Sequence, residues 1–277
     1  MQKEQAWVMQ HKSGYADSKQ SNVMDSYQYR LNNALFNSLW TKAAGEKYPS
    51  ELQPYSSCTV QLLEQLQGKL IAGSPQTVLD LGCGAGGFSR WLNQTLNCHV
   101  LGVDRSEFAI EYAQQHTPKG SNIEFFKLEF ENLSSLSAKF DSVISIDALP
   151  FARDEDQVLS NIHRLLNKGG QLIFTTREPL EGSPKFKKLG SAWRLALEKN
   201  GFELIEATER EGISEFWHAV YQEWVGHEVQ LRKVLPEEVV DGLMLEVEQV
   251  GPRLFDGRPW WLIHAKRIEM EEQKEKQ

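Results

Sequence analysis

The chain has 277 residues, of which 40% are hydrophobic, and it carries a formal net charge of −8 with a sequence pI near 5.5. This length allows one large folded core with additions, and the acidic balance, with lysine and arginine dispersed along the chain, argues against a nucleic-acid partner. Three cysteines in unrelated contexts indicate a reducing compartment and no metal site, and the absence of a signal sequence or a long apolar run predicts a cytoplasmic protein without membrane attachment.

The amino-terminal part of the chain changes character near residue 27. Residues up to Asn22 are rich in Gln, Lys and Ser, which is typical of a mobile segment. Apolar and aromatic residues then return at helical spacing from Tyr27 to Trp40, and a second helix is predicted from Thr59 to Leu70. We group residues 1–70 as a unit of amino-terminal cap helices.

The run from Val78 to Phe88 predicts a buried strand that ends in a glycine turn and opens a helix. Such a turn lets a ligand approach the backbone, and the helix that follows presents free N–H groups to it. Gly82, Gly84 and Gly87 also satisfy the G-x-G-x-x-G pattern of dinucleotide sites, and they fit a tight turn that serves no ligand. The glycines alone therefore leave the cofactor open.

Asp80 distinguishes between the possible cofactors, because it places a carboxylate two residues before Gly82 at the end of an apolar strand. A pyrophosphate would be repelled by this charge, whereas a sulfonium that bears an amino group would be attracted. The residue predicts S-adenosylmethionine as the cofactor.

A second apolar strand, His99 to Asp104, also ends in a carboxylate. Asp104 is placed where both hydroxyls of a ribose could donate to it. The alternative is that it caps the helix that follows Ser106.

With these two motifs the chain resembles the class I S-adenosylmethionine-dependent methyltransferases of the small-molecule type, from about Thr77 to Thr176. The resemblance implies an α/β fold with a doubly wound, mostly parallel seven-stranded sheet (Rossmann-like) and helical cap additions. It also implies that Asp104 binds the ribose of the cofactor and that Arg105 and Glu129 lie beside its adenine. The full set of residues that the resemblance implies for cofactor binding is Asp80, Gly82, Cys83, Gly84, Asp104, Arg105, Glu129, Phe130 and Ile146.

The cofactor-binding core is predicted over residues 71–210, with later strands near Phe125, Val143, Ile173 and Leu204. About fifty residues separate a sixth strand, which ends at Glu209, from the last one, which begins at Trp260. Two amphipathic runs in this insertion predict two helices, so residues 211–258 are interpreted as a further cap. Residues 259–277 form the last strand and a charged tail.

Asp147, at the end of the fourth strand, is the candidate catalytic residue, because it is placed to orient an amine or take its proton. Its loop is similar to that of the phosphoethanolamine and sarcosine methyltransferases, although Phe151 stands where those often carry a histidine. Capping of the next turn is the alternative for Asp147. The acceptor is expected to contact side chains of both caps and of the strand ends, namely Tyr27, Trp40, Phe151, Arg177, Trp217 and Tyr221. For the aromatic residues among them, packing in the core is the alternative.

The prediction for function is methyl transfer from S-adenosylmethionine to a nitrogen or oxygen of a small-molecule acceptor, by a monomer or a homodimer. Three alternatives stay open: a nicotinamide-dependent oxidoreductase, a cofactor-binding or partner protein without enzymatic activity, and a methyltransferase that acts on protein or RNA.

Overall fold

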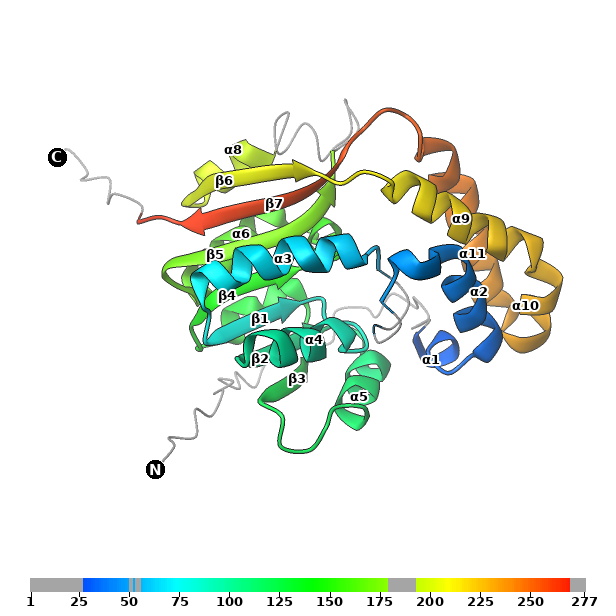
Figure 1. Ribbon diagram of the computed structural model, residues 1–277, viewed down its shortest axis with the longest axis horizontal. Helices are drawn as coiled ribbons and strands as arrows, with labels where there is room; N and C mark the ends of the chain where they lie inside the picture. The colour runs from blue at the N-terminus through cyan, green and yellow to red at the C-terminus, as the bar shows by residue number, and fades with distance from the viewer. Residues whose placement is uncertain (1–26, 50–51, 53–55, 179–192, 270–277) are drawn as a thin grey trace.

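The computed structural model describes residues 27–49, 52, 56–178 and 193–269. The expectations for the segment up to Asn22 and for the tail beyond residue 269 fall outside these residues. Within the described part, seven strands form one sheet in the order β3-β2-β1-β4-β5-β7-β6 (Figure 1). The strands are β1 (Thr77–Leu81), β2 (His99–Asp104), β3 (Ile123–Lys127), β4 (Phe140–Ser145), β5 (Leu166–Arg177), β6 (Phe202–Glu209) and β7 (Trp260–Arg267).

The sheet is parallel from β3 to β5, and only β7 runs against its neighbours β5 and β6. The central strands are apolar on both faces, as expected for parallel strands that helices cover on each side. Because β1, β2 and β4 are parallel, their carboxyl ends meet at one edge of the sheet. The predicted α/β fold and the predicted strands are confirmed, including the last one beyond the insertion.

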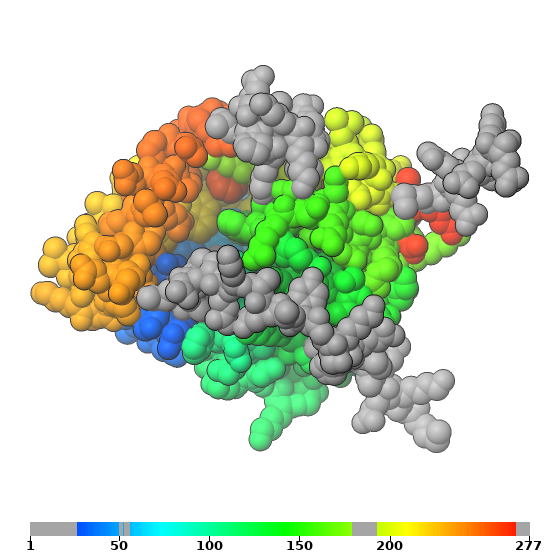
Figure 2. Space-filling view, turned by 180° about the vertical axis from the view of Figure 1, so that it is seen from behind, coloured from blue at the N-terminus to red at the C-terminus, as the bar shows by residue number. Residues whose placement is uncertain are grey.

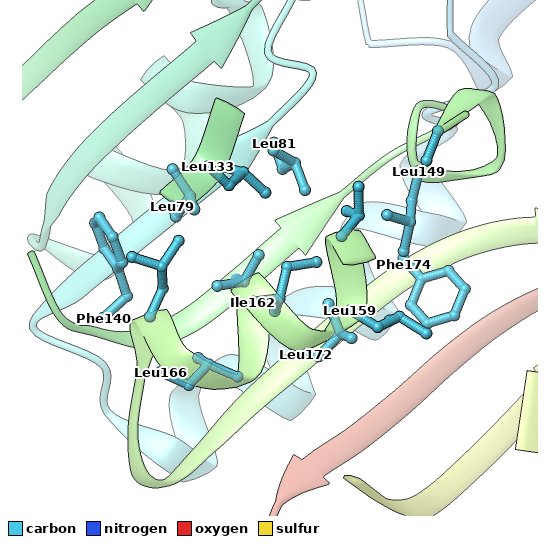
Figure 3. Close-up of a cluster of buried hydrophobic side chains, with 14 of the residues drawn as sticks. Leu79, Leu81, Leu133, Phe140, Leu149, Leu159, Ile162, Leu166, Leu172 and Phe174 are labelled. Atoms are coloured by element: carbon cyan, nitrogen blue, oxygen red, sulfur yellow. The ribbon is translucent and has the colours of Figure 1, made fainter. Parts of the chain in front are cut away.

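Helices cover both faces of the sheet (Figure 1). One face carries α3 (Val60–Gly73) and α4 (Gly87–Leu96), with α5 (Glu107–Gln115) toward the β3 edge, and the other carries α6 (Glu155–Leu165) and α8 (Trp193–Lys199). Figure 3 shows the core beneath the second face, where Leu79 of β1, Leu172 of β5 and Ile162 of α6 meet. These fully buried side chains hold the strands, and hence their carboxyl ends, in fixed positions.

Helix α3 belongs to the core by its contacts, although the sequence grouping 1–70 places it with the amino-terminal helices. Thr59 caps it by accepting a hydrogen bond from the N–H of Leu62. Its buried Leu66 and Leu70 pack in one cluster with Val78 of β1. The helix therefore supports the sheet rather than covering a ligand.

Apart from η2 (Phe130–Ser135) and η3 (Leu149–Phe151), which belong to the core, the remaining helices form a separate layer at one end of the sheet, which we call the cap (Figure 1). In Figure 2 its gold and orange part lies at one end of the molecule, beside the green core. Its own aromatic core includes Phe36, Trp40 and Trp224. The cap consists of α1 (Tyr27–Arg30), α2 (Ala34–Ala44), η1 (Gly45–Lys47), α9 (Ile213–Gly226), α10 (Glu228–Val234), α11 (Glu237–Val250) and η4 (Gly251–Arg253).

The cap differs from the sequence prediction in two places. The run from Tyr27 to Trp40 is broken, because Asn33 accepts a hydrogen bond from the N–H of Phe36 and so starts a new helix. The insertion holds a third α-helix, α10, in which Leu231 is the buried residue, so that its apolar period is too weak to see. None of the described helices is long and apolar enough to cross a membrane.

Candidate cofactor and acceptor site

The carboxyl ends of β1, β2 and β4 border a cavity of about 420 Å³. Tyr27 of the cap and the segment that contributes Leu52 and Ser56 close it from the amino-terminal side. Most of the site residues expected from the sequence line this cavity: Tyr27, Asp80, Gly82, Cys83, Gly84, Asp104, Arg105, Glu129, Phe130, Ile146, Asp147 and Phe151.

The glycine turn after β1 needs its glycines for two separate reasons. Gly82 has φ of 83°, and a Cβ atom there would lie 2.3 Å from the Cβ of Ala148. Gly84 has φ of 50°, and a Cβ atom would lie 3.0 Å from the hydroxyl of Tyr27. The N–H groups of Gly82 and Cys83 both donate to the carbonyl of Val103, which ties the turn to the end of β2. A side chain at these positions would strain the turn and fill the space between its walls.

Asp80 is a buried carboxylate on the floor of the cavity, with 2% of its surface exposed. The Ser89 hydroxyl donates to it at 2.5 Å. Burial raises the pKa of Asp80 to about 7, the hydrogen bond from Ser89 works against that rise, and the nearby Asp104 adds to it. A cation beside Asp80 would favour its ionised form, so the carboxylate is suited to a positively charged ligand.

Asp104 is fixed at the end of β2 by two backbone donors. The N–H of Gly84 donates to its Oδ2 at 3.0 Å, and the N–H of Ser106 donates to its Oδ1 at 2.9 Å. Ser106 is the N-cap residue of α5, because its hydroxyl accepts a hydrogen bond from the N–H of Ala109. Since Asp104 also lines the cavity, it can still accept hydrogen bonds from a ligand.

The border of the cavity at Arg105 and Glu129 is more exposed than its floor. Glu129 and Arg105 are both exposed residues of the lining. Arg153 lies 3.9 Å from the Glu129 carboxylate, and its N–H donates to Glu131. Phe151 is 82% exposed at this border of the cavity. These side chains form an exposed rim, in contrast to the buried floor.

Asp147 lies at the end of the cavity nearest the cap, with a left-handed backbone of φ 55°. Its Oδ2 accepts from the N–H of Ser57 at 2.5 Å and from the Ser57 hydroxyl at 2.8 Å. Its Oδ1 accepts from the Thr175 hydroxyl at 2.8 Å and lies 3.6 Å from the guanidinium of Arg210. The carboxylate is thus held by the protein on several sides, while 18% of the side chain stays exposed.

Sequence reasoning missed Ser57, Thr175 and Arg210, which surround Asp147. All three are buried polar residues, and each comes from a different part of the chain. Arg210 follows directly after β6, so its place at the carboxyl end of a strand was a usable signal. Ser57 and Thr175 carry no such signal, because serine and threonine are common in segments of this kind.

Four residues expected to bind the acceptor do not line the cavity: Trp40, Trp217, Tyr221 and Arg177. The three aromatic residues pack in the core of the cap instead, and the Tyr221 hydroxyl donates to Glu246. Arg177 donates to the carbonyl of Leu254 and pairs with Asp256, so it fixes the loop before β7. The expectation that these four residues contact the acceptor is therefore not met in this structure.

Neither a metal site nor a reactive thiol is found in the described part of the chain. No group of three or more His, Cys, Asp or Glu side chains there is arranged to hold a metal ion. Cys58 and Cys83 are buried, and burial raises the pKa of both thiols above the usual range. A thiol kept protonated is a weak nucleophile.

Comparison with known proteins decides the family. A family model described as a methyltransferase domain matches residues 73–223, which is more than half of the chain. The chain belongs to this methyltransferase family. The matched region begins at the end of α3 and runs through the sheet into α9, so it includes every contact to Asp80 and Asp104 described above.

The relatives and structural neighbours of this methyltransferase act on different acceptors. This chain is 29% identical over 157 residues to a sterol 24-C-methyltransferase of Pneumocystis carinii. The aligned region covers 48% of this chain and 41% of that protein. A putative sarcosine dimethylglycine methyltransferase from Galdieria sulphuraria matches with a TM-score of 0.65 and 16% identity over 76% of this chain and 86% of that chain. A mycolic acid cyclopropane synthase, crystallised with SAH, matches with a TM-score of 0.62 and 17% identity, over 87% and 98%.

The match to the sterol enzymes is partial, since the chain spans about two fifths of their length. The structural neighbours are below 25% identity, so they support the fold alone. What is shared is the class I S-adenosylmethionine-dependent core with its Rossmann-like sheet. The acceptor does not follow from these likenesses.

The cavity fits S-adenosylmethionine, the cofactor of this enzyme. The buried Asp80 carboxylate offers a partner for a cationic group, and the fixed Asp104 carboxylate offers an acceptor for ribose hydroxyls. The glycine turn keeps clear the space that a Cβ atom of residue 82 or 84 would occupy. Exposed Arg105 and Glu129 and part-buried Phe130 remain for the adenine.

Proposed function

We propose that this methyltransferase transfers the methyl group of S-adenosylmethionine to a nitrogen or oxygen atom of a small-molecule acceptor that enters the cavity beside Asp147. The observation that carries the proposal is the end of the cavity nearest the cap. There Asp147 lines the cavity together with Tyr27, Leu52 and Ser56, which offer apolar surface beside one fixed negative charge.

The state of Asp147 narrows the chemistry of the acceptor. Its carboxylate accepts hydrogen bonds from Ser57 and Thr175 and lies beside Arg210, so it is poorly placed to take up a proton as a general base. No histidine or lysine occurs among the described lining residues. An acceptor that is already nucleophilic, such as a neutral amine, suits this site best.

The residues of the chain then act by binding and orientation. When bound, S-adenosylmethionine supplies an electrophilic methyl group on a positively charged sulfur. Asp80 holds the positively charged methionine part of the cofactor and Asp104 holds its ribose, and the exposed edge of Asp147 orients the acceptor for an in-line approach. Tyr27 and Leu52 also line the cavity and reduce the contact of the acceptor with water.

The test is turnover with methyl-labelled S-adenosylmethionine against a panel of amines, carboxylates and phenols, read by S-adenosylhomocysteine formation and by the methylated product. A small amine should be methylated, and Asp147→Asn should raise its KM while the affinity for S-adenosylhomocysteine stays the same. Methylation only of a protein or RNA substrate would contradict the proposal, and so would cofactor binding with no acceptor at all.

The acidic character of the chain argues against the RNA alternative. The net charge is −8, and the lining contains Asp80, Asp104, Glu129, Glu131 and Asp147 against two arginines. A polyanion would have to approach this surface without a basic stripe to bind it.

A further inference from the structure

Arg210 connects the acceptor end of the cavity to the point where the chain leaves the sheet for the cap. It is the first residue after β6, and its backbone N–H donates to the carbonyl of Trp260 at 2.8 Å. The cap helix α9 begins three residues later at Ile213. Its side chain is only 3% exposed, so this is a buried cation at the base of the insertion.

The guanidinium of Arg210 makes all of its described contacts at the acceptor end. Nη1 donates to the Ser57 hydroxyl at 3.1 Å, and Nη2 donates to the Ser57 carbonyl at 2.5 Å. Nη1 also lies 3.6 Å from the Asp147 carboxylate. None of these contacts reaches Asp80 or Asp104, which hold the cofactor.

Ser57 is the centre of this group. Its N–H and hydroxyl both donate to Asp147, and its carbonyl accepts from Arg210 and from the N–H of Thr59. Thr59 in turn caps α3. The segment 56–59, which contributes Ser56 to the cavity wall, is therefore fixed between α3 on one side and the Arg210–Asp147 pair on the other.

We propose that Arg210 is a positioning residue for acceptor binding: it holds the Asp147 carboxylate and the wall segment 56–59 in the arrangement that the acceptor requires. This inference rests on the proposed function. A buried arginine beside one carboxylate keeps the pair charge-balanced, and its loss removes the cation beside Asp147 and the charged donor to the Ser57 carbonyl. Lysine would keep the charge but not the two-nitrogen contact to Ser57.

The experiment compares Arg210→Met and Arg210→Lys with Arg267→Met as a matched control. Arg267 also donates to a main-chain carbonyl, that of Leu166, but it lies at the far end of β7 from the cavity. In Arg210→Met, amide exchange of residues 56–59 should be about tenfold faster or more, because Ser57 loses a charged partner. Calorimetry should find the affinity for S-adenosylhomocysteine within about threefold of wild type, since no cofactor contact is lost.

Steady-state kinetics with the acceptor found in the turnover panel gives the second measurement. Arg210→Met should raise the acceptor KM about tenfold or more, and Arg210→Lys should recover part of that loss. In an Asp147→Asn background the same substitution should have a smaller effect, because Arg210 acts partly through that carboxylate. Arg267→Met should change none of these quantities.

The possible failures are distinct. If the wild type methylates no small molecule, the proposed function fails, and the exchange measurement alone then decides whether Arg210 fixes the wall. Unchanged exchange at residues 56–59, or equal losses of acceptor and cofactor affinity in Arg210→Met, would overturn the role of Arg210.

Discussion

At the scale of single residues, the site is defined by carboxylates that occur in different environments. Asp80 is buried with one hydroxyl donor, Asp104 is fixed by two backbone N–H groups, and Asp147 is surrounded by Ser57, Thr175 and Arg210. Asp80 and Asp104 both line the cavity beside the glycine turn, whereas Asp147 is held by groups from three separate parts of the chain. This difference separates the cofactor end from the acceptor end.

Asp80 makes a prediction about pH and stability. Its pKa in the folded protein, about 7, lies above the value of 3.8 for a free carboxyl, so the folded state loses stability as pH rises between these values. Asp80→Asn should therefore raise the melting temperature of the cofactor-free protein at pH 8 and leave it nearly unchanged at pH 4. It should also weaken S-adenosylhomocysteine binding, because the ionised carboxylate is lost.

Asp141 supplies a control of opposite sign. Hydrogen bonds from Asn167, Gln76 and Thr77 outweigh the effect of burial and hold the pKa of Asp141 below its usual value. Its contribution to stability is therefore present at neutral pH and lost as pH falls through the folded-state pKa. Asp141→Asn should lower the melting temperature at pH 8. A lower melting temperature for Asp80→Asn at pH 8 would show that the Asp80 charge is not costly.

Gly82 makes a second prediction at this scale, with Gly120 as its control. The two residues have nearly equal φ, 83° and 84°, but a Cβ atom would clash with Ala148 at Gly82 and meets nothing within 4 Å at Gly120. Gly82→Ala should cost more stability than the roughly 1 kcal/mol expected of φ strain at Gly120→Ala, and it should impair cofactor binding. Equal melting temperatures for the two variants would rule out the close approach.

At the scale of elements, the strands and the glycine turn could be predicted because their signals are local in the sequence. Apolar runs and glycines at fixed spacing define β1, the turn and α4 without knowledge of the rest of the chain. The acceptor end could not be predicted in this way. It depends on Ser57, Thr175 and Arg210, which the fold brings together from the segment before α3, from β5 and from the residue that follows β6.

The aromatic run of α9 shows why pattern alone misplaces side chains. Trp217 and Tyr221 recur at helical spacing, which suits a ligand wall and a helix core equally. In the structure α9 packs against α2, and the ring centroid of Trp40 lies 5.6 Å from the ring centroids of Phe216 and of Trp217. Once α2 covers this face, the aromatic residues belong to the cap core.

Trp40→Ala tests whether the cap is held together by this aromatic core. Trp40 is 1% exposed, so its truncation should destabilise the cap by about 3–5 kcal/mol. Amide exchange should accelerate in α2 and α9 and stay slow in β1 and β4. Phe108→Ala, at a residue 40% exposed on α5, is the control and should leave both regions unchanged. Equal acceleration in the sheet would mean that cap and core unfold together.

At the scale of the whole molecule, the cavity lies where the sheet places the ends of β1, β2 and β4, and Tyr27 of the cap contributes to its lining. Figure 1 shows the cap at one end of the sheet. The residues expected to bind the cofactor come from the core, at the ends of β1 and β2. The wall segment 56–59, Arg210 and Tyr27 lie outside the strands and the glycine turn. This division explains why the sequence predicts the cofactor and leaves the acceptor to experiment.

The measurement that tests the central claim most directly is calorimetric titration of wild type and Asp104→Ala with S-adenosylhomocysteine, and with NADH in parallel. The account predicts that wild type binds S-adenosylhomocysteine and not NADH, and that Asp104→Ala weakens this binding by about tenfold or more, since charge-assisted hydrogen bonds to the ribose are lost. Binding of NADH, or equal affinity of wild type and Asp104→Ala for S-adenosylhomocysteine, would contradict it.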